Sequence, residues 1–230
     1  GNTVEEFSIT HEKLIHVVLV SEDLQEFQHL HPTLNTETGV FTLENLTFKT
    51  NGTHYLYANF IAPDNMELPE ERATVLATNI LTVGTEKPQQ PQPRQKDLAD
   101  KTVDGFDVRL EKDGGPASPI FAQEETNLTL TVHKGAQQPA ALEPYLGELG
   151  HLVVIKQDTH DYIHAHPIRT EEASQVHFTV PFPDTGVYTL FFEFQVDGVV
   201  RMVSYVVEVA ANTSQNNQLK NATVDHHGHE

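Results

Sequence analysis

The sequence predicts an all-β protein built from two tandem antiparallel β-sandwich domains related by duplication. Three observations lead to this prediction. Short segments rich in β-branched and aromatic residues alternate apolar and polar positions with a period of two. Clusters of Gly, Pro, Asn and Asp separate these segments, as is typical of an antiparallel sandwich. The chain also matches itself at an offset of 135 residues (151 minus 16).

The internal match consists of two segments in each half of the chain. Residues 16–32 align with residues 151–167, and both segments begin with His and end in His-x-His-Pro. With one residue deleted, residues 52–60 then fall on residues 186–194. A whole domain is therefore expected to be repeated.

Taken in order, the first copy is expected to hold a short lead-in and four strands, at residues 4–10, 16–20, 25–31, 52–60 and 73–83. The second copy has counterparts of these strands, ending at 199–209, and two additional candidate strands at 106–111 and 127–133. The first domain is therefore expected to be a reduced sandwich. Helical periodicity of useful length is missing from the sequence, and residues 142–149 are expected to form at most one turn of helix.

The predicted domain boundaries follow from composition. The four parts are an amino-terminal domain, a Pro- and Gln-rich linker, a carboxy-terminal domain and a histidine-containing tail, at residues 1–84, 85–103, 104–210 and 211–230. The linker has few apolar residues to bury and is expected to be extended. The tail is expected to be disordered.

Composition excludes several classes of protein. The chain has no cysteine, so thiolate metal sites and disulfide scaffolds are ruled out. Its 14 Lys and Arg against 33 Asp and Glu give a net charge of −19, which disfavours nucleic acid and anionic membrane surfaces and attracts cations. No apolar run is long enough to span a membrane, and no retained signal peptide is recognised, which leaves export followed by trimming open.

The histidines carry the functional prediction. Strand residues two apart share a face, so His29 and His31 project together, as do His164 and His166. A hairpin centred between residues 22 and 23 pairs Val20 with Gln25 and sets His16 across from His29. The same arithmetic sets His151 beside His164. Each copy then offers three imidazoles, the minimum for a Zn(II) or Cu(II) site with an open position.

Further ligands and an alternative accompany this prediction. His11 could close the first site, and Glu148 could substitute for it in the second copy, where Leu146 is the counterpart of His11. Four histidines without a matched partner are expected to be surface or packing residues: His54, His133, His160 and His177. In the alternative interpretation, all these histidines hydrogen-bond within the sheets and have a structural role only.

The available ligands indicate which metal to expect. Met66 and Met202 are the only methionines, so the soft ligands that Cu(I) prefers are scarce. Neutral imidazole with an occasional carboxylate suits Cu(II) first and Zn(II) second. Because protons compete for imidazole near its pKa of about 6.5, affinity should fall steeply below pH ~6.

Residues 142–155 with 161–167, and residues 11–16 with 23–32 of the first copy, resemble a family of bacterial secreted proteins and lipoproteins. The resemblance covers nearly the whole chain outside the linker and tail. It implies Ig-like domains akin to the YtkA-like and FixH-like envelope domains, and an association with copper or heavy-metal handling. A location in the periplasm or at the cell surface is implied, with a lipid anchor on a removed amino-terminal segment as one arrangement.

We therefore expect an extracytoplasmic protein that captures, buffers or delivers Cu(II) or Zn(II), with a metal transporter or acceptor protein as its partner. The alternative is an Ig-like interaction or structural module. An enzyme is not expected, because the sequence shows no general base or nucleophile beside an open metal position. Glu148 is the carboxylate to test for such a role.

Overall fold

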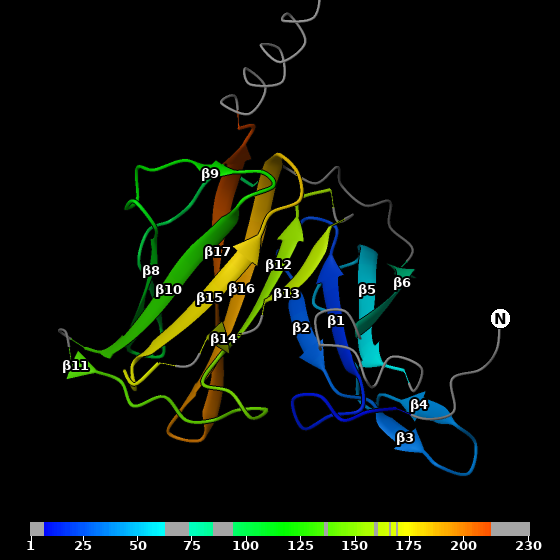
Figure 1. Ribbon diagram of the computed structural model, residues 1–230. Coiled ribbons are helices and arrows are strands. Elements are labelled where there is room, and N and C mark those ends of the chain that lie inside the picture. Colours follow the sequence, from blue (N-terminus) through cyan, green and yellow to red (C-terminus); the bar gives the residue numbers. More distant parts are fainter. Residues whose placement is uncertain are drawn as a thin grey trace, which may run out of the picture.

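The computed structural model describes residues 7–62, 74–84, 94–135, 138–158, 161–165, 167–168 and 170–212 of the 230-residue chain. Within these ranges the regular elements are strands, so the predicted all-β class is confirmed (Figure 1). The expected helical turn at 142–149 is instead a β-turn, in which Tyr145 and Glu148 exchange backbone hydrogen bonds. The tail from residue 213 onward and the first nine residues of the linker, residues 85–93, lie outside the described residues.

The first copy contributes strands β1 His16–Ser21, β2 Phe27–Leu30, β3 Thr33–Asn35, β4 Val40–Thr42, β5 Gly52–Ile61 and β6 Thr74–Val83. The second copy contributes β7 Lys101–Val103, β8 Phe106–Lys112, β9 Ile120–Phe121, β10 Glu125–Lys134, β11 Gln138–Pro139, β12 His151–Lys156, β13 Tyr162–Ala165, β14 Pro167–Ile168, β15 Gln175–Pro181, β16 Gly186–Val196 and β17 Val199–Ala210.

These strands form three main sheets, which we call first, middle and outer (Figure 1). The first sheet has the order β2-β1-β5-β6 and belongs to the first copy. The middle sheet, β13-β12-β16-β17-β9, and the outer sheet, β14-β15-β10-β8-β7 with β11 beside β10, belong to the second copy. Strands β3 and β4 form a separate two-stranded ribbon.

The middle sheet is buried on both faces. Leu152 and Val154 of β12 belong to the apolar core shared with the outer sheet, whereas Val153 and Ile155 belong to a second core shared with the first sheet. Because successive strand residues point to opposite faces, a strand between two cores must be apolar at every position. The second copy is thus a two-sheet sandwich, and the first copy packs its single sheet against it.

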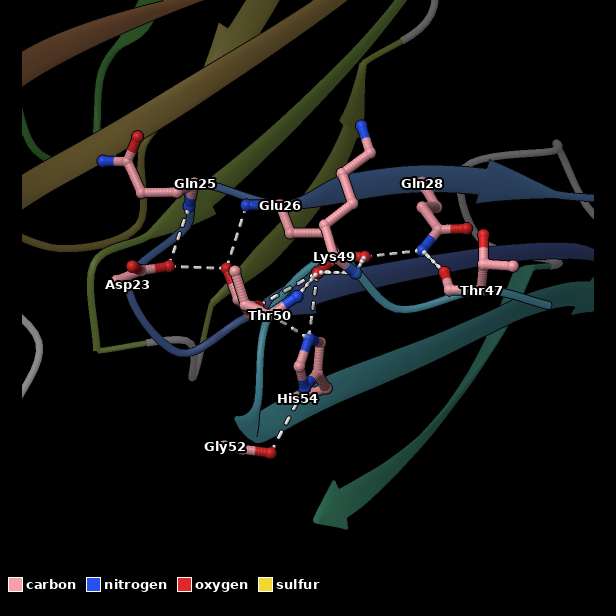
Figure 2. A network of polar contacts seen from close by, with 10 residues as sticks. Asp23, Gln25, Glu26, Gln28, Thr47, Lys49, Thr50, Gly52 and His54 are labelled. Carbon is pink, nitrogen blue, oxygen red and sulfur yellow. Dashed lines mark hydrogen bonds and ion pairs between the residues drawn. The ribbon is translucent and has the colours of Figure 1, made fainter. Parts of the chain in front are cut away.

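The first copy is the reduced unit that its shorter strand list predicts. A network of hydrogen bonds joins residues 47–50 to the face of the first sheet that points away from the second copy (Figure 2). Glu26, which is 2% exposed, accepts hydrogen bonds from the backbone N–H groups of Lys49 and Thr50. It also lies 3.3 Å from Nε2 of His54, which is fully buried. His54 is therefore a packing and hydrogen-bonding residue, as expected.

Burial raises the pKa of Glu26, but the hydrogen bonds from Lys49, His54, Thr50 and Gln28 outweigh this effect and leave that pKa below its usual value. The carboxylate is therefore held in its charged form inside the fold.

Within the part of the chain that the structure describes, no helix has the length and hydropathy that a membrane crossing requires.

Candidate metal centre

Two equivalent β-turns set the orientation of one histidine in each copy. Nε2 of His16 donates to the carbonyl oxygen of Thr10 at 2.9 Å, and Nε2 of His151 donates to that of Tyr145 at 2.7 Å. Both donor and acceptor are related by the offset of 135. Because a carbonyl only accepts, each ring carries its proton on Nε2 and presents Nδ1 as an acceptor.

The turns have the same unusual backbone in both copies. Their two central residues have positive φ angles, as in a type I′ turn: His11 45° and Glu12 64°, and Leu146 53° and Gly147 80°. The turn returns the chain so that its first carbonyl faces the strand that follows. The tautomer of the first strand histidine is therefore fixed by local structure.

A carboxylate of the second copy orients His29 of the first. Nδ1 of His29 lies 2.7 Å from Oε2 of Glu193 in β16, and the His29 side chain is fully buried. A carboxylate oxygen accepts the N–H of His29, which leaves Nε2 as the ligating nitrogen. Carboxylate–histidine pairs of this kind hold metal-binding imidazoles in position in many metalloproteins.

Three imidazole nitrogens of the first copy converge. Nδ1 of His16 lies 3.2 Å from Nε2 of His29 and 3.1 Å from Nε2 of His31. The ligand atoms of these three residues all lie within 4.8 Å of one another, so the group could hold a metal ion. With metal–nitrogen bonds of about 2.0–2.1 Å, nitrogens in a tetrahedral site lie about 3.3 Å apart. The two distances from His16 match that spacing, and the third is within 4.8 Å.

The hydrogen bonds outside this group determine what lies inside it. His16 directs a proton to Thr10 and His29 directs a proton to Glu193, so Nδ1 of His16 and Nε2 of His29 face each other 3.2 Å apart. Two lone pairs at that distance repel unless a cation lies between them. The site is therefore arranged for a cation, either a proton or a metal ion.

The predicted hairpin register is wrong by two residues. Val20 pairs with Phe27, and Val18, not His16, lies opposite His29. The connection is wider than predicted because Ser21 N–H bonds to the Glu26 carbonyl around a turn. The same shift sets Val153 opposite His164. Since the shift is two residues, every side chain keeps its predicted face, and a one-pair extension of the ladder sets His16 across from His31.

The structure adds histidines from outside the converging group. The His11 ring centre lies 5.9 Å from that of His16 and 5.3 Å from that of His151, and His29 lies 6.1 Å from His151. His11 therefore lies next to the first site, although it is not among the three residues whose ligand atoms converge, and its role as a ligand stays a prediction. It also contacts the second copy, which the sequence did not indicate.

The second copy's set is described only in part. His151 is 1% exposed and lies in the cluster. His164 belongs to β13, and the ladder fixes its backbone position opposite Val153. His166 and the His164 side chain lie outside what the structure describes. Glu148 lines a separate pocket with Pro144 and Leu149, and is not among the three residues that could hold the ion.

Burial and neighbouring histidines make protonation unfavourable in the cluster. Burial, with His29 and His16 nearby, lowers the pKa of His31 to about 3. Burial also lowers the pKa of His151 to about 3, with His11 and His29 adding to the shift and the bond to Tyr145 opposing it. Neutral imidazole is the form that binds metal, so these two residues are ready to ligate at neutral pH.

A pocket of about 640 Å³ lies beside the cluster, between the two copies. His11 and His16 form part of its wall, together with Tyr162 and Ile168 of the second copy. The pocket gives small molecules a route to the side of the buried His16.

Sequence reasoning did not identify Glu193. A signal was present, because Glu193 interrupts the apolar run of residues 186–194, and Asn59 is its counterpart in the first copy. A charged residue within a buried strand requires a partner. Finding that partner, His29, needed the packing of one copy on the other.

A family model described as Domain of unknown function (DUF8832) matches residues 1–75 and 101–211. No curated protein matches the chain. Among solved structures, a DUF4426 family protein from Pseudomonas aeruginosa has a TM-score of 0.37 at 9% identity, covering 50% of this chain and 98% of that one.

A copper-bound variant of FetP from uropathogenic Escherichia coli has a TM-score of 0.36 at 12% identity, covering 51% of this chain and 92% of that one. A putative lipoprotein from Bacillus anthracis has a TM-score of 0.28 at 13% identity, covering 54% and 86%. Structural similarity at this level carries no argument about function.

Proposed function

Because the chain belongs to the DUF8832 family, whose description names no activity, we propose its function from the histidine cluster: the protein binds a divalent transition-metal ion outside the cytoplasm. The observation that carries the proposal is the convergence of His16, His29 and His31, with the acceptor nitrogens of His16 and His29 3.2 Å apart. Hydrogen bonds to Thr10 and Glu193 direct those nitrogens inward.

Ligand chemistry favours Cu(II) first and Zn(II) second. Three neutral imidazoles bind both ions, and the Irving–Williams order places Cu(II) above Zn(II) at a site of nitrogen ligands. Three imidazoles are also the minimum protein ligand set for either ion. We propose that the ion is cargo for buffering or delivery to a transporter or acceptor protein, and that the protein is not an enzyme.

The sequence supports the proposed location. The resemblance to bacterial secreted proteins and lipoproteins indicates export, and the net charge of −19 attracts cations. An anchoring lipid on a segment preceding residue 1 fits this proposal.

The test is calorimetric titration of the metal-free chain with Cu(II) and with Zn(II) at pH 7.5. The tail offers imidazoles of its own, so every sample carries Ala at His226, His227 and His229. The triple variant His16→Ala, His29→Ala, His31→Ala should lose binding. A control that replaces His133 and His177, both in the outer sheet, should keep it.

The same samples separate metal binding from the structural alternative. If the histidines have a structural role only, the triple variant lowers the melting temperature equally with and without metal. If they bind metal, added ion raises the melting temperature of the unsubstituted site and leaves that of the triple variant unchanged. Absence of any binding at pH 7.5 would overturn the proposal.

A further inference from the structure

Two aromatic contacts join the first sheet to the middle sheet. Phe27 stacks on Phe191 with ring centres 4.4 Å apart, and Tyr57 stacks on Tyr162 at 4.8 Å. In the internal alignment Phe27 is the counterpart of Tyr162, and Tyr57 is the counterpart of Phe191. Exchanging the two copies therefore converts one of these contacts into the other. Reciprocal contacts of this kind are those of a two-fold symmetric interface.

The same exchange brings the equivalent histidines of the two copies together. His16 and His151 begin the equivalent strands β1 and β12, which lie in the first and middle sheets. The residues two further along, Val18 and Val153, are on the same face of each strand and lie in the core between these sheets. His11 lies between them, with ring centres 5.9 Å from His16 and 5.3 Å from His151. The imidazoles of the two copies therefore form one cluster.

Charge limits how many ions such a cluster can hold. His29 contacts both the first site and the second copy, with its ring centre 6.1 Å from His151. Within one largely buried cluster a bound dication repels a second one, so the second binding step is weaker than the first.

We infer that the two copies share one metal centre: a single divalent ion per chain, held by His16, His29 and His31 and completed when the ring of His151 moves toward it. In this structure His151 lies beside the group whose ligand atoms are within 4.8 Å of one another and is not part of it. The inference rests on the proposed function and adds its stoichiometry and its fourth ligand. The hydrogen bond from His151 Nε2 to Tyr145 presents Nδ1 as the ligating nitrogen, as the bond to Thr10 does for His16. Duplication then serves to complete the site instead of doubling it.

Two consequences are measurable in the full chain with Ala at the three tail histidines. Calorimetric titration with Cu(II) at pH 7.5 should give one ion per chain. His151→Gln should weaken Cu(II) binding at least tenfold and change the nitrogen hyperfine pattern in the electron paramagnetic resonance spectrum. The matched control His133→Gln, on the outer sheet, should alter neither.

The outcomes separate the inference from the proposed function. Two ions per chain would overturn the shared centre while leaving metal binding intact, and no ion would overturn both. One ion per chain with unchanged affinity and spectrum in His151→Gln would remove His151 from the site. The number of ions per chain is measured on the protein that retains His151. This measurement therefore still tests the shared centre if the His151→Gln variant fails to fold.

Discussion

Replacing Glu193 by Gln isolates the effect of one charge on the metal centre. The carboxylate lies 2.7 Å from Nδ1 of His29, and its side chain is 11% exposed. Adding the imidazole ring and the metal–nitrogen bond sets the carboxylate about 6 Å from an ion on Nε2. At an effective dielectric of about 20, a single negative charge at that distance attracts a dication by about 5 kcal/mol.

The measured effect should be smaller, because the free carboxylate also loses hydration in the fold. Removing a carboxylate that supports a ligating histidine typically lowers metal affinity 10–100-fold, or about 1.4–2.7 kcal/mol. Gln keeps the size and the accepting oxygen of Glu193, so a loss of this size reports the charge. We expect Glu193→Gln to weaken Cu(II) binding by that factor.

The assay is competition for Cu(II) against a chelator of known affinity at pH 7.5. Glu208→Gln is the matched control, because it removes the same charge from an exposed position on β17 of the same sheet. Thermal melting of both metal-free variants checks that each is folded. Equal Cu(II) affinities for the two variants would show that Glu193 does not support a ligand, and would refute the reasoning.

Three predictions concern stability. Burial holds the pKa of His151 near 3, below the unfolded value of about 6.5, so the unfolded state binds more protons between these values. The metal-free protein should therefore lose stability as pH falls from 6.5 toward 3, by at most about 5 kcal/mol, and His151→Gln should flatten that dependence in urea titrations. Glu26→Gln should lower the free energy of unfolding by about 2–4 kcal/mol at pH 7, because buried donors lose a charged acceptor. An unchanged midpoint in urea unfolding would contradict the role given to the network with His54. Gly150→Ala should lower the free energy of unfolding by about 1–3 kcal/mol, because the added Cβ would lie 2.6 Å from the fully buried ring of Phe192. Differential scanning calorimetry measures this loss. An unchanged melting temperature would show that the ring can move aside.

The strand pattern was predictable because it depends on local alternation. The runs that begin at His16 and His151 are strands, as predicted. The offset of 135 that relates these two histidines also relates Thr10 to Tyr145, whose carbonyl oxygens accept their hydrogen bonds in the structure. The hairpin register was not predictable, because a wider turn bonded from Ser21 to Glu26 moves the pairing by two residues. The error left the predicted faces intact, since strand side chains repeat every two residues.

The extent of each predicted domain, the assignment of Glu148 and the site on His164 and His166 stay predictions. The remaining question at the sequence level was how the two copies are placed relative to each other. Self-alignment gives equivalence between residues, but equivalent residues can face each other or lie far apart.

The sequence by itself determined the all-β class, the repeat and the strands that carry the His-x-His pairs, because these depend on period-two alternation and residue identity. Only the tertiary structure placed His151 beside His11 and His29, and paired His29 with Glu193, 164 residues away. The physical reason is that the middle sheet must bury both of its faces. It does so by packing one against the first copy, which brings the two histidine-bearing ends together.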